Sequence, residues 1–273
     1  MKNVCSQTQE NFEKLKKAKV ILLDLDGTVY IDYEPIDGVI ASLERLRASG
    51  RKLVYLTNNS SKSYKDYEKN LRLSGIFESG DEIYTSAMAT AEYLNEEKPG
   101  ARVYLLAPDD VKADFRAAGV NVVESSPDVA VLAYDITLDY KKIREFDYFL
   151  KSGVYYVATH PDFTCPAKGC SVPDAGSFIE MFRASSGRAP DLIVGKPRSA
   201  MGERIKKRYG VQSDEVLMVG DRLSTDIAFG NNCGFYTALV YTGEATRESY
   251  AASDVKATVD CENFAVLTEK ILE

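Results

Sequence analysis

"VILLDLDGTVY", residues 20–30, places four apolar residues directly before two acids, Asp24 and Asp26. A short aliphatic run bounded by turn residues predicts a buried strand, and Gly27 after the second acid indicates a sharp turn. Side chains two residues apart in an extended chain point to the same side. The stretch therefore predicts a strand of a parallel sheet that presents two carboxylates at its carboxyl end.

The same alternation of short apolar runs and helix-like segments continues on both sides of this stretch and predicts a parallel α/β fold. Strands are expected at 20–27, 52–59 and 82–86, with helices at 38–50 and 63–75 between them. A second series of strands and helices occupies roughly residues 86–187, with a loop rich in Pro, Gly and Cys near its end. Residues 191–272 return to the first style. The simplest architecture is a Rossmann-like parallel-sheet domain interrupted by an inserted α/β domain.

Composition limits the classes of function. The chain has 273 residues and a net charge of −7, which disfavours binding to nucleic acid or to anionic lipid. No apolar run approaches the roughly 20 residues that span a bilayer, and the first residues lack the apolar middle of a signal peptide. The five cysteines are an odd number scattered along the chain, which favours reduced thiols. We expect a cytoplasmic protein.

Polar residues follow the predicted strands where they end, and in open α/β sheets ligands bind at that edge. These residues are Asp24 and Asp26, then Thr57 and Asn58, then Gly195 and Lys196, and finally Gly220, Asp221 and Asp226.

A cluster of this composition suits phosphoryl transfer. Crowded carboxylates repel one another unless a cation is present, and oxygen ligands with open positions suit Mg²⁺. A hydroxyl, a backbone amide and a lysine match the needs of phosphoryl oxygens. The phosphate-cradling pattern G-x-x-x-x-G-K-[ST] and a helix-opening G-x-G-x-x-G are both missing, which removes P-loop hydrolysis and dinucleotide redox chemistry as competitors.

Four segments, "DLDGT" (24–28), "LTNNS" (56–60), "VGKP" (194–197) and "GDRLSTD" (220–226), resemble in order the four motifs of the haloacid dehalogenase superfamily of phosphohydrolases. The insertion between the second and third motifs resembles the large α/β cap of the NagD-like, para-nitrophenylphosphatase subfamily. The resemblance implies a catalytic core at 1–85 and 187–273, and a cap that determines substrate specificity at 86–186.

The resemblance also implies roles for the two acids of the first motif. Asp24 is expected to be the nucleophile that forms an aspartyl-phosphate, which divides one displacement into two easier ones. Asp26 is expected to protonate the leaving alkoxide and then to take a proton from the attacking water.

The other motifs supply the expected phosphate and metal contacts. The Thr57 hydroxyl and the Asn58 backbone amide are expected to hold the phosphate, and Lys196 to offset its charge. By resemblance, the Mg²⁺ ligands are Asp24, the Asp26 backbone carbonyl and Asp221, and Asp226 completes the metal site by ordering these ligands from behind them or by acting through a water.

Two further residues have open roles. Asn59 either touches substrate or caps the helix that follows it. His160 is the only histidine of the chain and stands where relatives often carry Asn. It either contacts substrate or is an exposed loop residue.

The function expected from the sequence is a Mg²⁺-dependent phosphatase that hydrolyses small-molecule phosphomonoesters. Two alternatives stay open: a phosphotransferase that uses the same intermediate, and a non-catalytic regulator that binds phosphometabolites. The expected partner is the small substrate rather than nucleic acid or membrane. The oligomeric state is open, and the resemblance adds a homodimer formed through the cap as one alternative.

Overall fold

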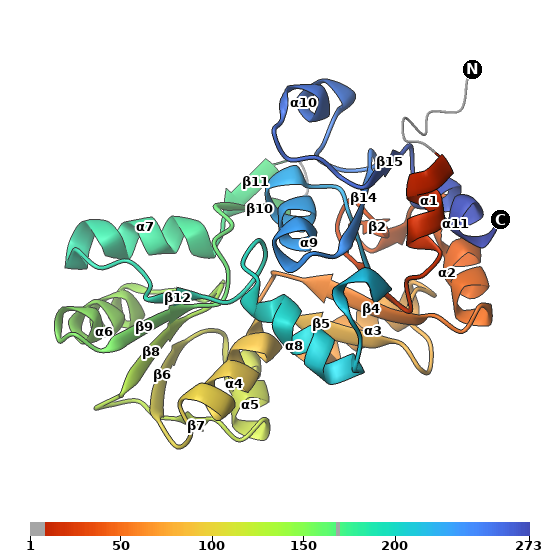
Figure 1. Cartoon of the computed structure of the whole chain (residues 1–273). Coiled ribbons are helices and arrows are strands. Elements are labelled where there is room, and N and C mark those ends of the chain that lie inside the picture. Colours follow the sequence, from red (N-terminus) through yellow and green to blue (C-terminus); the bar gives the residue numbers. More distant parts are fainter. Residues whose placement is uncertain (1–8, 168–169) are drawn as a thin grey trace. The chain divides into compact units, whose positions relative to one another are not determined.

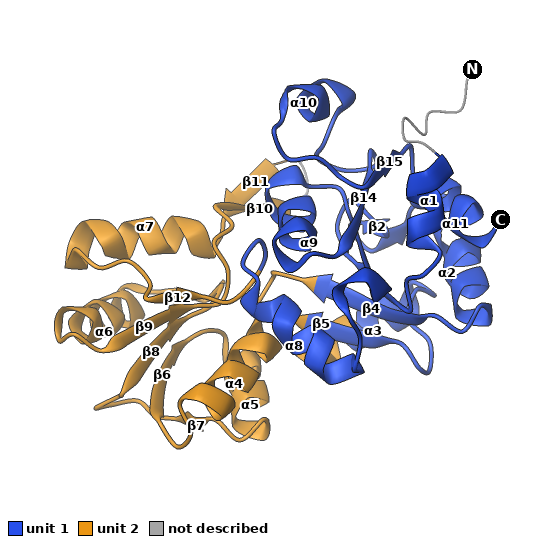
Figure 2. Ribbon diagram, viewed as in Figure 1, with its two compact units in different colours: residues 1–56, 68–84, 196–273 blue, residues 57–67, 85–195 orange. Residues whose placement is uncertain are grey.

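A computed structural model of the chain describes residues 9–167 and 170–273. Its contacts divide the chain into two compact units (Figure 2). Unit 1 consists of residues up to 56, 68–84 and 196–273, and unit 2 consists of residues 57–67 and 85–195. The predicted insertion, residues 86–186, lies inside unit 2, which in addition holds 57–67, Thr85 and 187–195. The division into a catalytic core and a specificity cap stays a prediction.

Among the described residues, unit 1 is built on a six-stranded sheet with the order β15-β14-β13-β1-β4-β5 (Figure 1). The strands are β1 (Val20–Leu23), β4 (Lys52–Thr57), β5 (Glu82–Thr85), β13 (Val216–Gly220), β14 (Tyr236–Val240) and β15 (Val259–Cys261). A small antiparallel pair, β2 (Tyr30–Ile31) and β3 (Glu34–Pro35), follows β1. The helices are α1 (Gln9–Leu15), α2 (Val39–Ala48), α8 (Ala200–Tyr209), the 3₁₀ helix η1 (Ser213–Glu215), the π-helix η2 (Leu223–Ile227), α9 (Ala228–Cys233), α10 (Arg247–Ala252) and α11 (Phe264–Leu272). Helix α3 (Tyr64–Leu73) begins in unit 2 and belongs to unit 1 from Glu68 on.

The middle of this sheet is apolar because its central strands are covered on both faces. Every residue of β1 and of β13 is buried. β1 pairs in parallel with β13 and with β4, so that Leu23 is opposite both Val219 and Tyr55. Helices α2, α11 and α1 pack together beside the sheet, and α8 packs with α9 (Figure 1). The carboxyl ends of β13, β1 and β4 therefore lie next to one another at one edge.

Unit 2 has a parallel sheet of its own with the order β12-β9-β8-β6-β7. Its elements are α4 (Ser86–Glu97), β6 (Arg102–Leu106), α5 (Asp109–Ala117), β7 (Asn121–Val122), β8 (Val129–Leu132), α6 (Tyr140–Lys151), β9 (Tyr155–Ala158), β10 (Thr164–Ala167), β11 (Cys170–Pro173), α7 (Ala175–Ser186) and β12 (Leu192–Ile193). Side chains from β6, β8 and β9 pack with those of α6 and α7, including Tyr104, Phe146 and Phe182, to form its core. The prediction of an α/β fold with parallel sheets is confirmed.

Two local predictions need correction. Residues 191–197 were expected to continue the first sheet, but Leu192 pairs with Val157 and Ile193 pairs with Ala158, so β12 belongs to the sheet of unit 2. The loop rich in Pro, Gly and Cys contains an antiparallel hairpin, β10–β11. Short edge strands of this kind carry too few residues for their pattern to reveal their partner.

No helix in the described part of the chain combines the length and the apolar character that a membrane crossing requires. Cys165, Cys170, Cys233 and Cys261 form no disulfide, whereas Cys5 lies outside the described residues.

Candidate active site

The two acids of the first motif follow β1 directly. The amide of Asp24 donates to the carbonyl of Val219 at 3.0 Å, which extends the pairing of β1 with β13 by one residue. Asp26 is exposed and accepts a hydrogen bond from the Tyr30 hydroxyl at 3.2 Å. Gly27 between them and β2 has a φ of 85°, a conformation that L side chains rarely adopt. The sharp turn predicted after the second acid is present.

Lys196 is the centre of a buried ion cluster in unit 1. Its side chain is 2% exposed, and its Nζ lies 2.5 Å from Asp24 Oδ1 and 2.6 Å from Asp226 Oδ1. The same ammonium donates to the backbone carbonyl of Leu56 at 3.3 Å. Lys196 therefore joins the ends of β1 and β4 to the segment after β13.

Asp221 and Asp226 are held by backbone donors and by close packing. Asp221 comes directly after β13 and accepts from the amide of Glu244 at 2.7 Å, whereas Asp226 lies in the π-helix η2 and accepts from the amide of Arg222 at 3.1 Å. A Cβ at Gly220 would lie 2.2 Å from the Cβ of Asp226. Glycine is required at position 220 because Asp226 occupies that space.

Three carboxylates gather in this cluster: one oxygen from each of Asp24, Asp221 and Asp226 lies within 4.8 Å of the other two. Three carboxylates face one lysine. Burial, and then the negative charge of Asp226, raise the pKa of Asp24 well above its usual range. The same two causes raise the pKa of Asp221 to about 6. Arg222 also acts on these acids, but its guanidinium is paired with Glu244 at 3.0 Å. Three carboxylates around one lysine therefore remain in negative excess, which is the environment that a divalent cation stabilises.

Burial disfavours the ammonium form of Lys196, but the neighbouring carboxylates of Asp226 and Asp24 outweigh this effect and raise its pKa. The lysine therefore stays charged at neutral pH. It supplies a fixed positive charge beside Asp24.

The predicted phosphate-contacting residues Thr57, Asn58 and Asn59 lie in unit 2, although Thr57 is the last residue of β4. Thr57 and Asn58 are buried. The amide of Asn59 donates to Thr57 Oγ1 at 3.1 Å, and the Oδ1 of Asn59 accepts from the amide of Ser61 at 2.9 Å. The Asn59 side chain thus bonds within the turn before α3 (Tyr64–Leu73), whereas the hydroxyl of Ser63 accepts from the amide of Asp66 in the first turn of that helix at 3.3 Å. The predicted capping of α3 by Asn59 is not seen, and its contact with substrate stays a prediction.

His160 is fully buried in unit 2, and both ring nitrogens have protein partners. Nδ1 lies 2.9 Å from Thr159 Oγ1, and Nε2 lies 2.9 Å from Asp174 Oδ1. His160 is therefore not an exposed loop residue. Asp174, which was not predicted, also caps α7; its place directly before a helical pattern was the sequence signal for that role.

The structure brings together five of the predicted residues within unit 1 and four within unit 2. The first set is Asp24, Asp26, Lys196, Asp221 and Asp226, and the second is Thr57, Asn58, Asn59 and His160. Sequence reasoning missed Thr28 and Tyr30, which bond to Asp221 at 3.3 Å and to Asp26 at 3.2 Å. Thr28 is the last residue of the first motif, "DLDGT", which was the sequence signal for it, whereas Tyr30 carries no pattern that distinguishes it from ordinary core.

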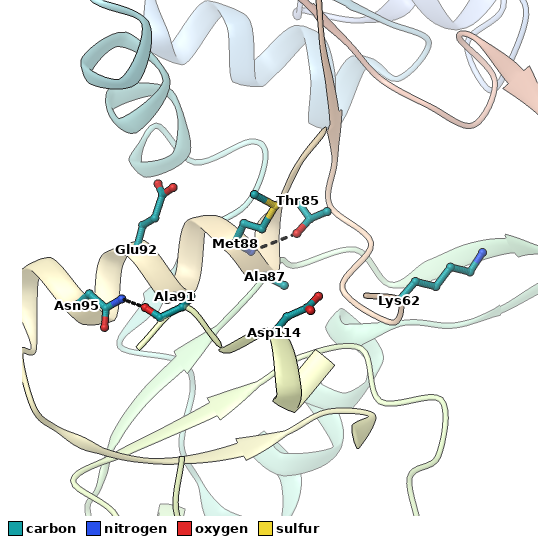
Figure 3. Close-up of a pocket in the computed structure, with 9 residues that line it drawn as sticks. Lys62, Thr85, Ala87, Met88, Ala91, Glu92, Asn95 and Asp114 are labelled. Carbon is teal, nitrogen blue, oxygen red and sulfur yellow. Dashed lines mark hydrogen bonds between the residues drawn. The ribbon is translucent and has the colours of Figure 1, made fainter. Parts of the chain in front are cut away.

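A pocket of about 160 Å³ lies elsewhere in unit 2, between α4, α5 and Lys62 (Figure 3). Its lining includes Thr85, Met88 and Asp114 but none of the predicted site residues. Thr85 Oγ1 accepts from the amide of Met88 at 3.1 Å and so caps α4. The polar groups of the pocket thus serve the local fold.

A parallel sheet that gathers three carboxylates and one lysine at its carboxyl edge defines an α/β enzyme of the phosphate-handling class. Residues 21–121 match a family model described as haloacid dehalogenase-like hydrolase, and residues 193–267 match a second model of the same kind. The chain belongs to the haloacid dehalogenase-like hydrolases, and within them to the NagD-like phosphatases.

Relatives of known name match almost the whole chain. An acid sugar phosphatase of Staphylococcus aureus is 33% identical over 260 residues, which are 95% of this chain and 99% of the relative. The structure of a 4-nitrophenylphosphatase from Thermotoga maritima is 38% identical with a TM-score of 0.90, covering 94% of this chain and 98% of that one. A glycerol phosphate phosphatase from Mycobacterium tuberculosis, solved in complex with magnesium, is 28% identical with a TM-score of 0.86, covering 93% and 78%.

Proposed function

We propose that this enzyme is a Mg²⁺-dependent phosphatase that hydrolyses small-molecule phosphomonoesters through an aspartyl-phosphate on Asp24. The observation that carries the proposal is the buried ion cluster in which Lys196 contacts Asp24 at 2.5 Å and Asp226 at 2.6 Å. A nucleophilic carboxylate beside a fixed ammonium and further carboxylates has little use in a purely structural role, because burying such charges is costly.

In the first half-reaction, a carboxylate oxygen of Asp24 attacks phosphorus, and the bond from phosphorus to the ester oxygen breaks. Asp26 gives its proton to the departing alkoxide. In the second half-reaction, Asp26 takes a proton from water while the water oxygen attacks phosphorus, which releases phosphate and restores Asp24. The exposure of Asp26 and its bond to Tyr30 suit a group that must exchange protons in each cycle.

We further propose that residues 57–61, called the phosphate-binding segment below, hold the phosphoryl oxygens through the Thr57 hydroxyl and the Asn58 amide. Their position supports this role, because Thr57 ends β4 and β4 is the direct neighbour of β1. Lys196 would offset the charge that develops on the same oxygens.

The donor set fits a magnesium ion. Three carboxylates and one lysine leave a surplus of negative charge, and their oxygens approach within 4.8 Å of one another. Asp24, Asp221, Asp226 and the backbone carbonyl of Asp26 would hold the ion. When bound, Mg²⁺ neutralises charge on the cluster and on the phosphate oxygens. The magnesium complex of the glycerol phosphate phosphatase relative supports this choice of metal.

The names of the relatives support small phosphate esters as substrates, since they act on sugar phosphate, glycerol phosphate or nitrophenyl phosphate. We propose that residues 86–186 form the cap that selects among such esters. A closed cap would exclude bulk water until the aspartyl-phosphate has formed.

The test is hydrolysis of para-nitrophenyl phosphate and a panel of sugar, glycerol and nucleoside phosphates, with Mg²⁺ or with EDTA. Wild type is compared with Asp24→Asn and with Asp214→Asn, an exposed residue of unit 1 that serves as the matched control. We expect turnover that needs Mg²⁺, falls by at least about 10³-fold in Asp24→Asn, and is unchanged in Asp214→Asn. Turnover of Asp24→Asn within tenfold of wild type would refute covalent catalysis by Asp24.

A further inference from the structure

His160 is connected to the phosphate-binding segment by a chain of side-chain hydrogen bonds inside unit 2. His160 Nδ1 lies 2.9 Å from Thr159 Oγ1, and Thr159 Oγ1 lies 3.0 Å from Ser60 Oγ. The amide of Tyr134 in turn donates to Ser60 Oγ at 2.8 Å. This series of hydrogen bonds therefore reaches from the residues after β9 to Ser60, within residues 57–61.

The direction of each hydrogen bond follows from the partner at the far side of the ring. Asp174 Oδ1 already accepts from the amide of Ala175 at 2.6 Å, and a carboxylate only accepts, so His160 Nε2 is the donor to it. In a neutral imidazole the other nitrogen then accepts, here from the Thr159 hydroxyl. The Thr159 oxygen is left to accept from the Ser60 hydroxyl. With Ser60 donating to Thr159, Thr159 to His160 and His160 to Asp174, every donor in this series of hydrogen bonds has an acceptor.

Because these hydrogen bonds are buried, the loss of any one of the side chains leaves its partner without a replacement. His160, Thr159 and Ser60 are all 0% exposed. Water therefore has no access to replace a lost partner, and a buried polar group without one is strongly disfavoured. The hydroxyl of Ser60 is thus held in place by residues of the loop after β9.

A second connection joins the same two segments. Asn58 Nδ2 donates to Asp162 Oδ2 at 3.1 Å, and the backbone carbonyl of Asp162 accepts from the amide of Gly176 at 2.7 Å. A Cβ at Gly195 would lie 2.6 Å from Asn58 Oδ1, so the Asn58 side chain is also confined by packing. Asn58 and Ser60 are therefore both tied to residues 159–162.

We propose that His160 is a positioning residue: through Thr159 and Ser60 it holds the phosphate-binding segment in the conformation that binds phosphate. The proposal rests on the function proposed above for Thr57 and Asn58. It assigns His160 no contact with substrate, and it makes residues 159–162, which follow β9, a determinant of phosphate affinity.

The experiment compares Thr159→Val, which removes the hydroxyl at nearly constant volume, with Thr159→Ser, which retains it. His160→Leu removes both ring hydrogen bonds. The matched control is Thr237→Val, because Thr237 in β14 of unit 1 is also 0% exposed and its hydroxyl accepts from the amide of Thr258 at 2.9 Å. The measurements are kcat and KM for para-nitrophenyl phosphate, the inhibition constant of inorganic phosphate, and hydrogen exchange of peptides covering residues 57–61.

We expect Thr159→Val and His160→Leu to raise KM and the phosphate inhibition constant about tenfold and to speed exchange at 57–61, because each variant breaks the series of buried hydrogen bonds that ends at Ser60. Thr159→Ser should restore both constants to within about twofold, a rescue that general destabilisation does not give. Thr237→Val should lower the melting temperature without changing either constant. If Thr159→Val fails to fold, Ser60→Ala is used instead, because it removes the other partner of the hydrogen bond between Ser60 and Thr159.

Phosphate inhibition and exchange in Thr159→Val that match those of Thr237→Val would overturn the positioning role. If the wild type hydrolyses no ester, the proposed function fails, and the exchange measurement alone tests the connection. Faster exchange at 57–61 in Thr159→Val then supports the connection, and unchanged exchange overturns it.

Discussion

Replacing Lys196 by methionine removes the only ammonium that contacts Asp24 and Asp226 in the part of the chain that the structure describes. The side chain is 2% exposed, and it loses contacts of 2.5 Å and 2.6 Å to the two carboxylates and 3.3 Å to the carbonyl of Leu56. Removing one partner of a buried ion pair costs about 3–5 kcal/mol, because the other charge stays buried. We expect the free energy of unfolding in EDTA to fall by this amount.

The free energy of unfolding lost in Lys196→Met should depend on pH, and the surroundings of Asp24 determine in which direction. Burial and Asp226 already raise the pKa of Asp24, so without the lysine its carboxyl becomes still easier to protonate. A folded-state pKa above the unfolded value means that stability falls as pH rises, since the folded state binds the proton more tightly. The destabilisation should therefore be larger at pH 8 than at pH 5.

Urea unfolding followed by circular dichroism, at both pH values and in EDTA, measures these changes. The control is Lys52→Met, whose ammonium contacts Glu82 at 2.6 Å while its side chain is 30% exposed. A partly exposed pair of this kind contributes about 1 kcal/mol at most. A loss in Lys196→Met no larger than in Lys52→Met would refute the view that Lys196 holds a buried charge cluster together.

Three further results are expected. Mg²⁺ should raise the melting temperature more at pH 7.5 than at pH 5, because burial raises the pKa of Asp221 to about 6 and the protonated acid binds cations poorly. Gly220→Ala should abolish Mg²⁺-dependent stabilisation, since its Cβ would lie 2.2 Å from that of Asp226. Iodoacetamide at pH 8 should alkylate exposed Cys170 before buried Cys233, whose thiol pKa burial raises to about 12, leaving roughly 10³-fold less thiolate.

Each expectation has a contrary outcome. Equal stabilisation by Mg²⁺ at the two pH values would show that these carboxylates do not compete with protons for the ion. Normal Mg²⁺ binding by Gly220→Ala would mean that the turn after β13 can move to make room for the added Cβ without weakening the metal site. Mass spectrometry that finds both thiols modified at equal rates would show that the core around Cys233 opens readily.

The sequence predicted which acids stand at the ends of β1 and β13, because these residues are local. Asp24 directly follows an aliphatic run, and Asp221 follows another, so the strand and its terminal acid are visible in one short window. Parallel strands share a carboxyl edge, and this rule alone places the two acids together.

The unit boundaries and the buried surroundings of His160 could not be predicted from the sequence. β12 contributes two residues, Leu192 and Ile193, which would suit the edge of either parallel sheet. The hydrogen bond between Ser60 and Thr159 joins residues 99 positions apart, and no sequence pattern around either residue predicts this pairing. Such long-range pairs depend on the packed structure and leave no periodic pattern.

The chain passes between the two units at 56/57, 67/68, 84/85 and 195/196, so residues 57–67 belong to unit 2 although they precede α4. This connectivity sets a rule for chimeras between relatives. Exchange of residues 85–195 alone would combine a foreign segment with the native residues 57–67, and the side chains of Asn58 and Ser60 would then face residues that do not match them. A chimera therefore needs both segments of unit 2, residues 57–67 and 85–195, from the same relative. In natural relatives, substitutions in one of these segments should be accompanied by substitutions in the other.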